Sequence, residues 1–225
     1  MESEASTSVK SKLISLTNKK KKQKTYNPLV WILDSDSVLA PHLLNNKYLN
    51  SSINKGIQIL ICARFWLAGI RNKKAFTYWL DENHAESTMQ QLFKDYSFAP
   101  GSVLKFTFFT HRTTKWARKC KEHMKYLEDF IWNGVCEWSE RTGYSHQQYD
   151  LAEYLCVIRP ISEQMPAAHL KEIIPEWKNI PPQFRQNDVY KAFRIFYAHC
   201  IGDPWEAYAK DKVDIPEFML NNNYA

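Results

Sequence analysis

Residues 105–125 contain seven basic side chains and only one acidic side chain, which gives this segment a net charge of +6. The basic residues are Lys105, Arg112, Lys115, Arg118, Lys119, Lys121 and Lys125. Cations at this density favour an anionic partner such as nucleic acid. An ordinary solvated helix face is the alternative interpretation.

The elements expected around this zone resemble those of a DNA reader. The segment SVLKFTFFT alternates in polarity and predicts a strand over 103–110, and the residues after it predict a helix. A ribbon-helix-helix protein has this order, and it pairs two strands across a dimer axis in the major groove. Lys105, Thr107 and Arg112 would then approach the bases. The phosphates would be held by Lys115, Arg118, Lys119 and Lys121.

A second strand-then-helix order begins at Gly56, so residues 57–62 could form the ribbon instead. The polar residues around it are Lys55, Gln58, Arg64, Arg71, Lys73 and Lys74. The apolar character of this run, however, is equally typical of a buried strand.

The first 25 residues contain seven lysines and two glutamates, a net charge of +5, and show no sustained apolar period. We expect a flexible basic arm over residues 1–25 and a single domain over 26–225. Five lysines of the arm would add non-specific contacts to phosphates: Lys19, Lys20, Lys21, Lys22 and Lys24. The alternative is a solvated tail.

An enzymatic hypothesis rests on Asp34 and Asp36, which follow the apolar run LVWIL. This pattern resembles the first motif of haloacid-dehalogenase-type phosphotransferases, in which the first Asp is the nucleophile and the second an acid/base. Thr110 and Asp203 could imitate later motifs. The same residues are also typical of a turn or a helix cap.

Composition argues against that class of enzyme. The chain has six glycines, whereas an average chain of its length has about fifteen, and phosphate-binding loops need glycine. The five cysteines include no CxxC pair, and only Cys120 and His123 share a helical spacing that suits a metal. We therefore expect a cytoplasmic protein with reduced cysteines, no metal, no cofactor, no membrane segment and no enzymatic activity.

The remaining pattern is mostly helical. Apolar residues recur at spacings of three and four from Trp116 to Trp138, which predicts one long central helix that starts at Thr113 or Thr114 and stops at Gly143. Shorter helices are expected over 147–157, 169–174 and 187–201, and a short strand is expected over 28–33. The predicted class is α+β, mostly helical, with short strands and a strand–helix unit of the ribbon-helix-helix type.

One family resemblance appears in the order of these segments. The chain shows GIQILICARFWLAGIR, YWLDENHAESTMQQL and VLKFTF, then a long helix with YLEDFIW, and finally GYSHQQYDLAEYL and IPPQFRQNDVYKAF. This order resembles proteins of integrative conjugative elements and the AcaB-type regulators of conjugative plasmids, over roughly residues 55–200. The resemblance implies a homodimeric activator of conjugative-transfer genes that binds double-stranded DNA.

The sequence therefore predicts a DNA-binding transcriptional regulator. Two alternatives stay open: a Mg²⁺-dependent phosphotransferase that uses Asp34 and Asp36, and a non-catalytic scaffold of a mobile element or phage that binds protein through its aromatic surface.

Overall fold

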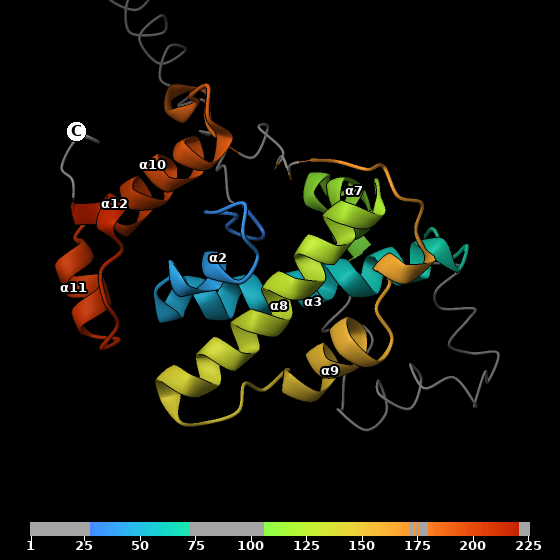
Figure 1. Cartoon of the computed structure of the whole chain (residues 1–225), viewed down its shortest axis with the longest axis horizontal. Helices are drawn as coiled ribbons and strands as arrows, with labels where there is room; N and C mark the ends of the chain where they lie inside the picture. The colour runs from blue at the N-terminus through green and yellow to red at the C-terminus, as the bar shows by residue number, and fades with distance from the viewer. Residues whose placement is uncertain (1–27, 73–105, 172, 174, 176–179, 221–225) are drawn as a thin grey trace, which may run out of the picture.

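All regular elements in the described residues are helical (Figure 1). The computed structural model describes residues 28–72, 106–171, 173, 175 and 180–220. Its α-helices are α2 (Leu39–His42), α3 (Asn46–Leu67), α7 (Arg112–Ala117), α8 (Lys121–Thr142), α9 (Tyr149–Glu153), α10 (Val189–Ile201), α11 (Pro204–Ala209) and α12 (Glu217–Leu220). Short 3₁₀ turns are η1 (Phe106–Thr110), η3 (Ser162–Gln164) and η5 (Pro182–Phe184), and η2 (Tyr154–Ile158) is a π-helical turn. The predicted α+β class is therefore wrong for the described residues.

The strand predicted over 57–62 lies in the middle of α3, which begins where the Asn45 side chain accepts a hydrogen bond of 3.0 Å from the Tyr48 N–H. Every residue of this run except Gln58 is buried. A helix enclosed on nearly all sides loses the alternation between polar and apolar faces, so its sequence looks like that of a buried strand.

The other two predicted strands are also absent from the described residues. Residues 106–110 form the 3₁₀ turn η1, and the beginning of that predicted strand, 103–105, lies outside the described part of the chain. Residues 29–33 are irregular and buried. Because no strand pairs with η1, there is no ribbon-helix-helix unit in the part of the chain that the structure describes.

The predicted central helix is divided into α7 and α8. Its end is confirmed, because Gly143 caps α8 in the left-handed conformation at φ 73°. Cys120 interrupts it with an extended backbone (φ −157°, ψ 167°). The interruption is stable because the Lys121 N–H donates to the Pro166 carbonyl, at 2.9 Å, from outside the helix.

The core forms where α8 crosses α3 (Figure 1), and two of the six glycines lie at this crossing. A Cβ atom on Gly56 would stand 2.8 Å from Ile131, and one on Gly134 would stand 3.1 Å from Ile53. The two helices therefore pack closely because these positions lack side chains.

The C-terminal helices α10 to α12 join this core through aromatic rings. The Trp31 ring lies 5.3 Å from Phe196 and 5.2 Å from Tyr197, measured between centroids. The Asn45 N–H also donates to the Tyr197 hydroxyl at 2.9 Å. No helix within the described ranges combines the length and the apolar character that crossing a membrane requires.

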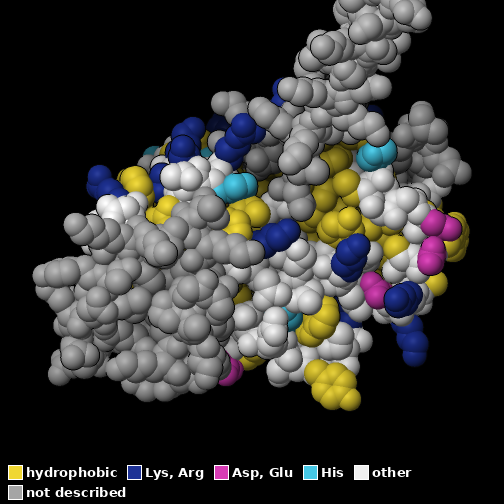
Figure 2. All heavy atoms as spheres, turned by 180° about the vertical axis from the view of Figure 1, so that it is seen from behind, with side chains coloured by type: hydrophobic (Ala, Val, Ile, Leu, Met, Phe, Trp, Pro, Cys, Tyr) yellow, Lys and Arg dark blue, Asp and Glu magenta, His cyan; other side chains and the backbone are white. Residues whose placement is uncertain are grey.

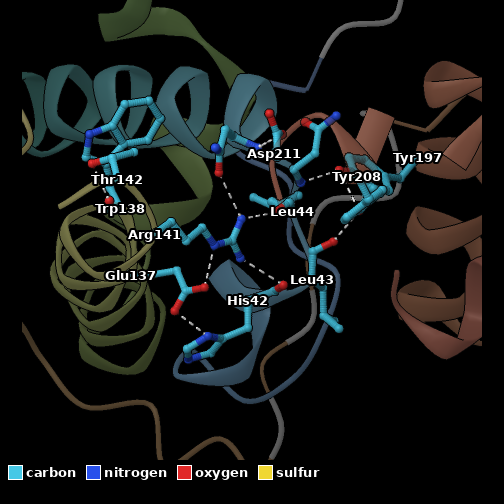
Figure 3. A network of polar contacts seen from close by, with 12 residues as sticks. His42, Leu43, Leu44, Glu137, Trp138, Arg141, Thr142, Tyr197, Tyr208 and Asp211 are labelled. Carbon is cyan, nitrogen blue, oxygen red and sulfur yellow. Dashed lines mark hydrogen bonds and ion pairs between the residues drawn. The ribbon is translucent and has the colours of Figure 1, made fainter. Parts of the chain in front are cut away.

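A polar network holds the turn of residues 42–46 between α2 and α3 (Figure 3). We call it the turn network. Arg141 of α8 donates to the His42 carbonyl at 3.0 Å and to the Leu44 carbonyl at 2.6 Å, and it pairs with Glu137, which also contacts His42. From α11, the Tyr208 hydroxyl donates to the Leu43 carbonyl at 2.7 Å. The network thereby links the turn to α8 and to the C-terminal helices.

Candidate nucleic-acid interface

The structure brings two basic groups, separate in the sequence, onto one surface. α3 packs against η1 and α7. As a result, Lys55 of α3 and Arg112 of α7 both lie close enough to His111 to lower the pKa of its imidazole, after burial has lowered it most. Just beyond the ends of these two helices, Arg71 and the α7 C-cap residue Arg118 each lie over the ring of Trp66.

We call this surface the basic face. We use this name for seven cations on or next to α3 and α7 that the structure describes, namely Lys55, Arg71, Arg112, Lys115, Arg118, Lys119 and Lys121. Five of the seven side chains are exposed, and Lys55 and Arg118 are half-buried. Seen from behind, Lys and Arg side chains gather over α7 and the nearby end of α3, at the upper left of Figure 2. Most of the acidic side chains in that view lie at the opposite edge, toward the C-terminal helices.

The sequence excludes acidic residues from both parts of this surface. Residues 46–72 contain no Asp or Glu, and neither do residues 106–121. The carboxylate that follows them, Glu122, accepts hydrogen bonds from the Ala168 N–H at 3.0 Å and the His169 N–H at 2.7 Å. These bonds, with that of Ala168 as the largest cause, lower the pKa of Glu122 to about 2. The Glu122 carboxylate is therefore bound to the loop that crosses the start of α8.

Trp66 positions two guanidinium groups. The Cζ atom of Arg118 lies 3.7 Å from the centroid of the indole, which is van der Waals contact, and that of Arg71 lies 4.9 Å away. Arg118 also donates to the Phe109 carbonyl at 3.2 Å. Burial lowers the pKa of Arg118, and the charge of Arg71 lowers it further. Two guanidinium groups thus contact one indole, and they are close enough for the charge of Arg71 to act on Arg118.

His111 fixes the start of α7. Its Nδ1 atom accepts a hydrogen bond of 3.2 Å from the Thr113 N–H, so it is the cap in place of the predicted Thr113 or Thr114. An Nδ1 atom that accepts must be unprotonated, and burial keeps the imidazole neutral by lowering its pKa. The cap orients α7, and with it Arg112 and Lys115, on the surface of the molecule.

The other residues predicted for DNA contact have different positions. Thr107 lies in η1 and not on a ribbon, whereas Lys105 lies outside the described residues. The arm lysines at 19–24 and the lysines at 73–74 also lie outside them. Arg64 belongs to another side of α3, where its guanidinium lies over the Tyr154 ring at 5.5 Å.

Cys120 and His123 have packing roles. The His123 ring stacks on Trp116 with centroids 4.6 Å apart, and its Nδ1 atom lies 2.9 Å from the Trp116 carbonyl oxygen. Burial raises the pKa of the Cys120 thiol. In the described ranges, no group of three His, Cys, Asp or Glu side chains is arranged to hold a metal ion.

Asp34 and Asp36 are bound to backbone and to an arginine. The Asp34 Oδ1 atom accepts from the Asp36 N–H at 2.9 Å, and the Asp36 Oδ1 atom accepts from the Val38 N–H at 2.8 Å. Arg194 of α10 pairs with Asp34, and Asp203 caps α11 through the Trp205 N–H at 2.9 Å. These carboxylates serve as turn and helix caps.

Comparison with known proteins supplies no further guide. No family model matches the sequence, and neither the curated proteins nor the solved structures include a match. The resemblance to AcaB-type regulators therefore stays a prediction.

Sequence reasoning missed how the basic face is assembled. Trp66 was not singled out, and Arg71 was expected only as a member of the second group, because no strand or helix pattern shows that α3 and α7 are neighbours. One signal was available in the sequence: both acid-free segments, 46–72 and 106–121, are long for a chain with 24 acidic residues.

Proposed function

We propose that this protein is a DNA-binding regulator that contacts the phosphate backbone of a duplex through the basic face. The observation that carries the proposal is that two acid-free segments, distant in sequence, pack together with their cations outward. Lysine and arginine side chains on such a surface release counterions when they neutralise phosphates, which drives binding. The proposal needs no paired ribbon, and so it does not depend on a homodimer.

The size of the face suits a short stretch of duplex. From Lys55 to Leu67, α3 rises about 18 Å, which corresponds to roughly five steps of 3.4 Å along one DNA strand. The exposed side chains of Arg112 and Lys115 lie on α7, which packs beside this helix. Phosphate contacts could therefore come from Lys55 on α3 and from Arg112 and Lys115 on the helix that packs beside it.

The salt dependence of binding tests this proposal. Fluorescence anisotropy with a labelled duplex should show a slope of log K against log salt that becomes shallower by about 0.9 for each phosphate contact removed. The variant Lys115→Ala/Arg118→Ala/Lys119→Ala should therefore lose about 2.7 from the slope and much of its affinity at low salt. Because Arg118 also packs on Trp66, the double variant Lys115→Ala/Lys119→Ala provides a version that leaves this packing intact.

The matched control is Lys191→Ala/Lys210→Ala, which removes two exposed lysines from the C-terminal helices. It should keep the slope of the natural protein. Equal slopes for the control and for Lys115→Ala/Lys119→Ala would remove the basic face from the proposal, and absence of any duplex binding at low salt would refute DNA binding altogether.

The regulatory part of the proposal needs its own test. Bound fragments recovered from a digest of the source genome and sequenced should concentrate upstream of a small set of genes. An even distribution over the genome would contradict a regulator and would leave general DNA binding in place.

A further inference from the structure

The two arginines over Trp66 differ from the other cations of the basic face. The lysines of that face each present one charge on a flexible stem, whereas Arg71 and Arg118 are fixed at 4.9 Å and 3.7 Å from one indole centroid. Arg118 is fixed a second time by its bond to the Phe109 carbonyl. A pre-organised pair of guanidinium groups loses little conformational entropy when it binds an anion.

The charges of this pair are not balanced by the protein within the described residues. The ion pairs between described residues involve His42, Lys125, Arg141 and Arg194, and none includes Arg71 or Arg118. The charge of Arg71 disfavours that of Arg118, so an anion that joins them would relieve a repulsion already present. One Arg118 nitrogen is used by Phe109, and the rest of the guanidinium fork remains for a ligand.

We propose that Arg71 and Arg118 form a site for one doubly charged phosphate group, the terminal phosphate monoester of a DNA strand. Two cations match a dianion, whereas an internal phosphodiester carries one charge and is satisfied by one lysine or arginine. Arginine forks also bind phosphate oxygens in a bidentate manner that lysine cannot reproduce. This inference rests on the proposed DNA binding and makes it specific for strand ends.

Two short duplexes of one sequence, one with 5′-phosphates and one with 5′-hydroxyls, test the inference. The natural protein should bind the phosphorylated duplex about tenfold more tightly, the value expected for charge-assisted bonds to one added group. Arg71→Gln, at an exposed position, should abolish this preference without disturbing the fold. Arg118→Gln should also abolish the preference. Arg71→Lys should retain only part of the preference for the phosphorylated duplex, because lysine supplies the positive charge but not the planar guanidinium group.

Lys115→Ala is the matched control for contacts to internal phosphates. This substitution should lower the affinity for both duplexes by the same factor, so the tenfold ratio between the two affinities should persist. If Lys115→Ala removes the ratio as completely as Arg71→Gln does, the preference is a general charge effect and the site is refuted.

Inorganic phosphate, compared with chloride at equal ionic strength, distinguishes a strand end from free phosphate. Phosphate should lower the affinity for the phosphorylated duplex toward the affinity for the hydroxyl duplex. The affinity for the hydroxyl duplex should not change. Equal affinity of the natural protein for both duplexes would overturn the terminal-phosphate site and leave the proposed function standing. Failure to bind either duplex at low salt would overturn both.

Discussion

The turn network and the basic face both contain arginines, but their surroundings differ. In the turn network, Arg141 has a side chain that is 6% exposed, and its donors reach Glu137 and two backbone carbonyls. On the basic face, Lys115 and Lys119 are exposed, and the segments that carry them contain no acidic residue. One region therefore uses cations to hold chain segments together, and the other presents them to solvent.

The burial of a charged side chain indicates whether it stabilises the fold or is available to a partner. A charge removed from water must be paired and hydrogen-bonded, and its loss leaves a partner unpaired. An exposed charge costs little to keep and contributes little to stability, so its concentration on one surface calls for an explanation outside folding. The comparison predicts that substitutions in the turn network change stability and spare DNA binding, and that substitutions of the exposed lysines of the basic face do the opposite.

Removing Arg141 should have the largest effect on stability. Arg141→Ala leaves the buried Glu137 carboxylate without its guanidinium and frees two carbonyls of the turn, so we expect a loss of about 3 kcal/mol in the free energy of unfolding. Urea denaturation followed by circular dichroism measures it. Lys125→Ala, which breaks the exposed pair with Asp129, is the control and should change stability by less than about 0.5 kcal/mol.

At a temperature where Arg141→Ala is still folded, its affinity for a duplex should equal that of the natural protein. A loss of affinity comparable to that of Lys115→Ala/Lys119→Ala would show that the turn network and the basic face do not have separate roles.

Gly56→Ala should have the next largest effect. The added methyl group would meet the Ile131 side chain at 2.8 Å in the α3–α8 crossing, which over-packs the core and costs about 2 kcal/mol. Gly134→Ala is the matched variant, and its contact of 3.1 Å with Ile53 should make it less costly. Thermal unfolding of both variants shows which substitution costs more stability. A Gly56→Ala protein that is more stable than its parent would refute the close packing of α3 on α8.

Acid should destabilise the fold through His146. Burial lowers the pKa of this residue from 6.5 to about 4, and its Nδ1 atom accepts from the Gln148 N–H at 3.1 Å while the ring is neutral. Because the unfolded chain binds the proton first, stability falls with the pH below about 6.5, by about 1 kcal/mol between pH 6.5 and 5.5.

The pH dependence is measured as urea unfolding of the natural protein and of His146→Gln at pH 7.5, 6.5 and 5.5. The variant should be less stable at pH 7.5 and should show a shallower fall toward pH 5.5. Parallel curves for the two proteins would show that another group carries the dependence.

Lys115→Ala should have the smallest effect on stability, because the lysine is exposed and makes no ion pair with a described carboxylate. We expect a change below about 0.5 kcal/mol, whereas the salt slope of duplex binding should fall by about 0.9. Together these values would sharpen the separation of the two regions, and a large change in unfolding free energy would contradict it.

Local chemistry made part of the fold predictable. Gly143 ends α8 as expected because glycine tolerates the left-handed conformation that this cap requires. α10 was predicted within two residues, since Asp188 caps it and an apolar stripe follows. The interior of α3 was not predictable from its period, because a run with nearly every residue buried fits a strand and a helix equally well. The break at Cys120 depends on the Pro166 carbonyl, a contact distant in sequence.

The candidate site was predictable as a list of charges and not as an arrangement. The sequence placed the cations from Arg112 to Lys121 in one zone, and the structure leaves all of them except the half-buried Arg118 exposed. It could not show that α3 lies beside α7, and so it separated Arg71 from Arg118, which the structure brings to the same indole. The expected ribbon was wrong because alternation in a short aromatic segment does not supply the partner strand that a ribbon needs.

Lysine acetylation in the presence and absence of duplex DNA measures directly whether the basic face contacts DNA. The protein is treated briefly with an acetylating reagent at low salt, and modification of each lysine is measured by mass spectrometry. We expect DNA to protect Lys115, Lys119 and Lys121 and to leave Lys191 and Lys210 as reactive as in the free protein. Equal protection of both groups, or protection of the C-terminal lysines alone, would contradict this expectation.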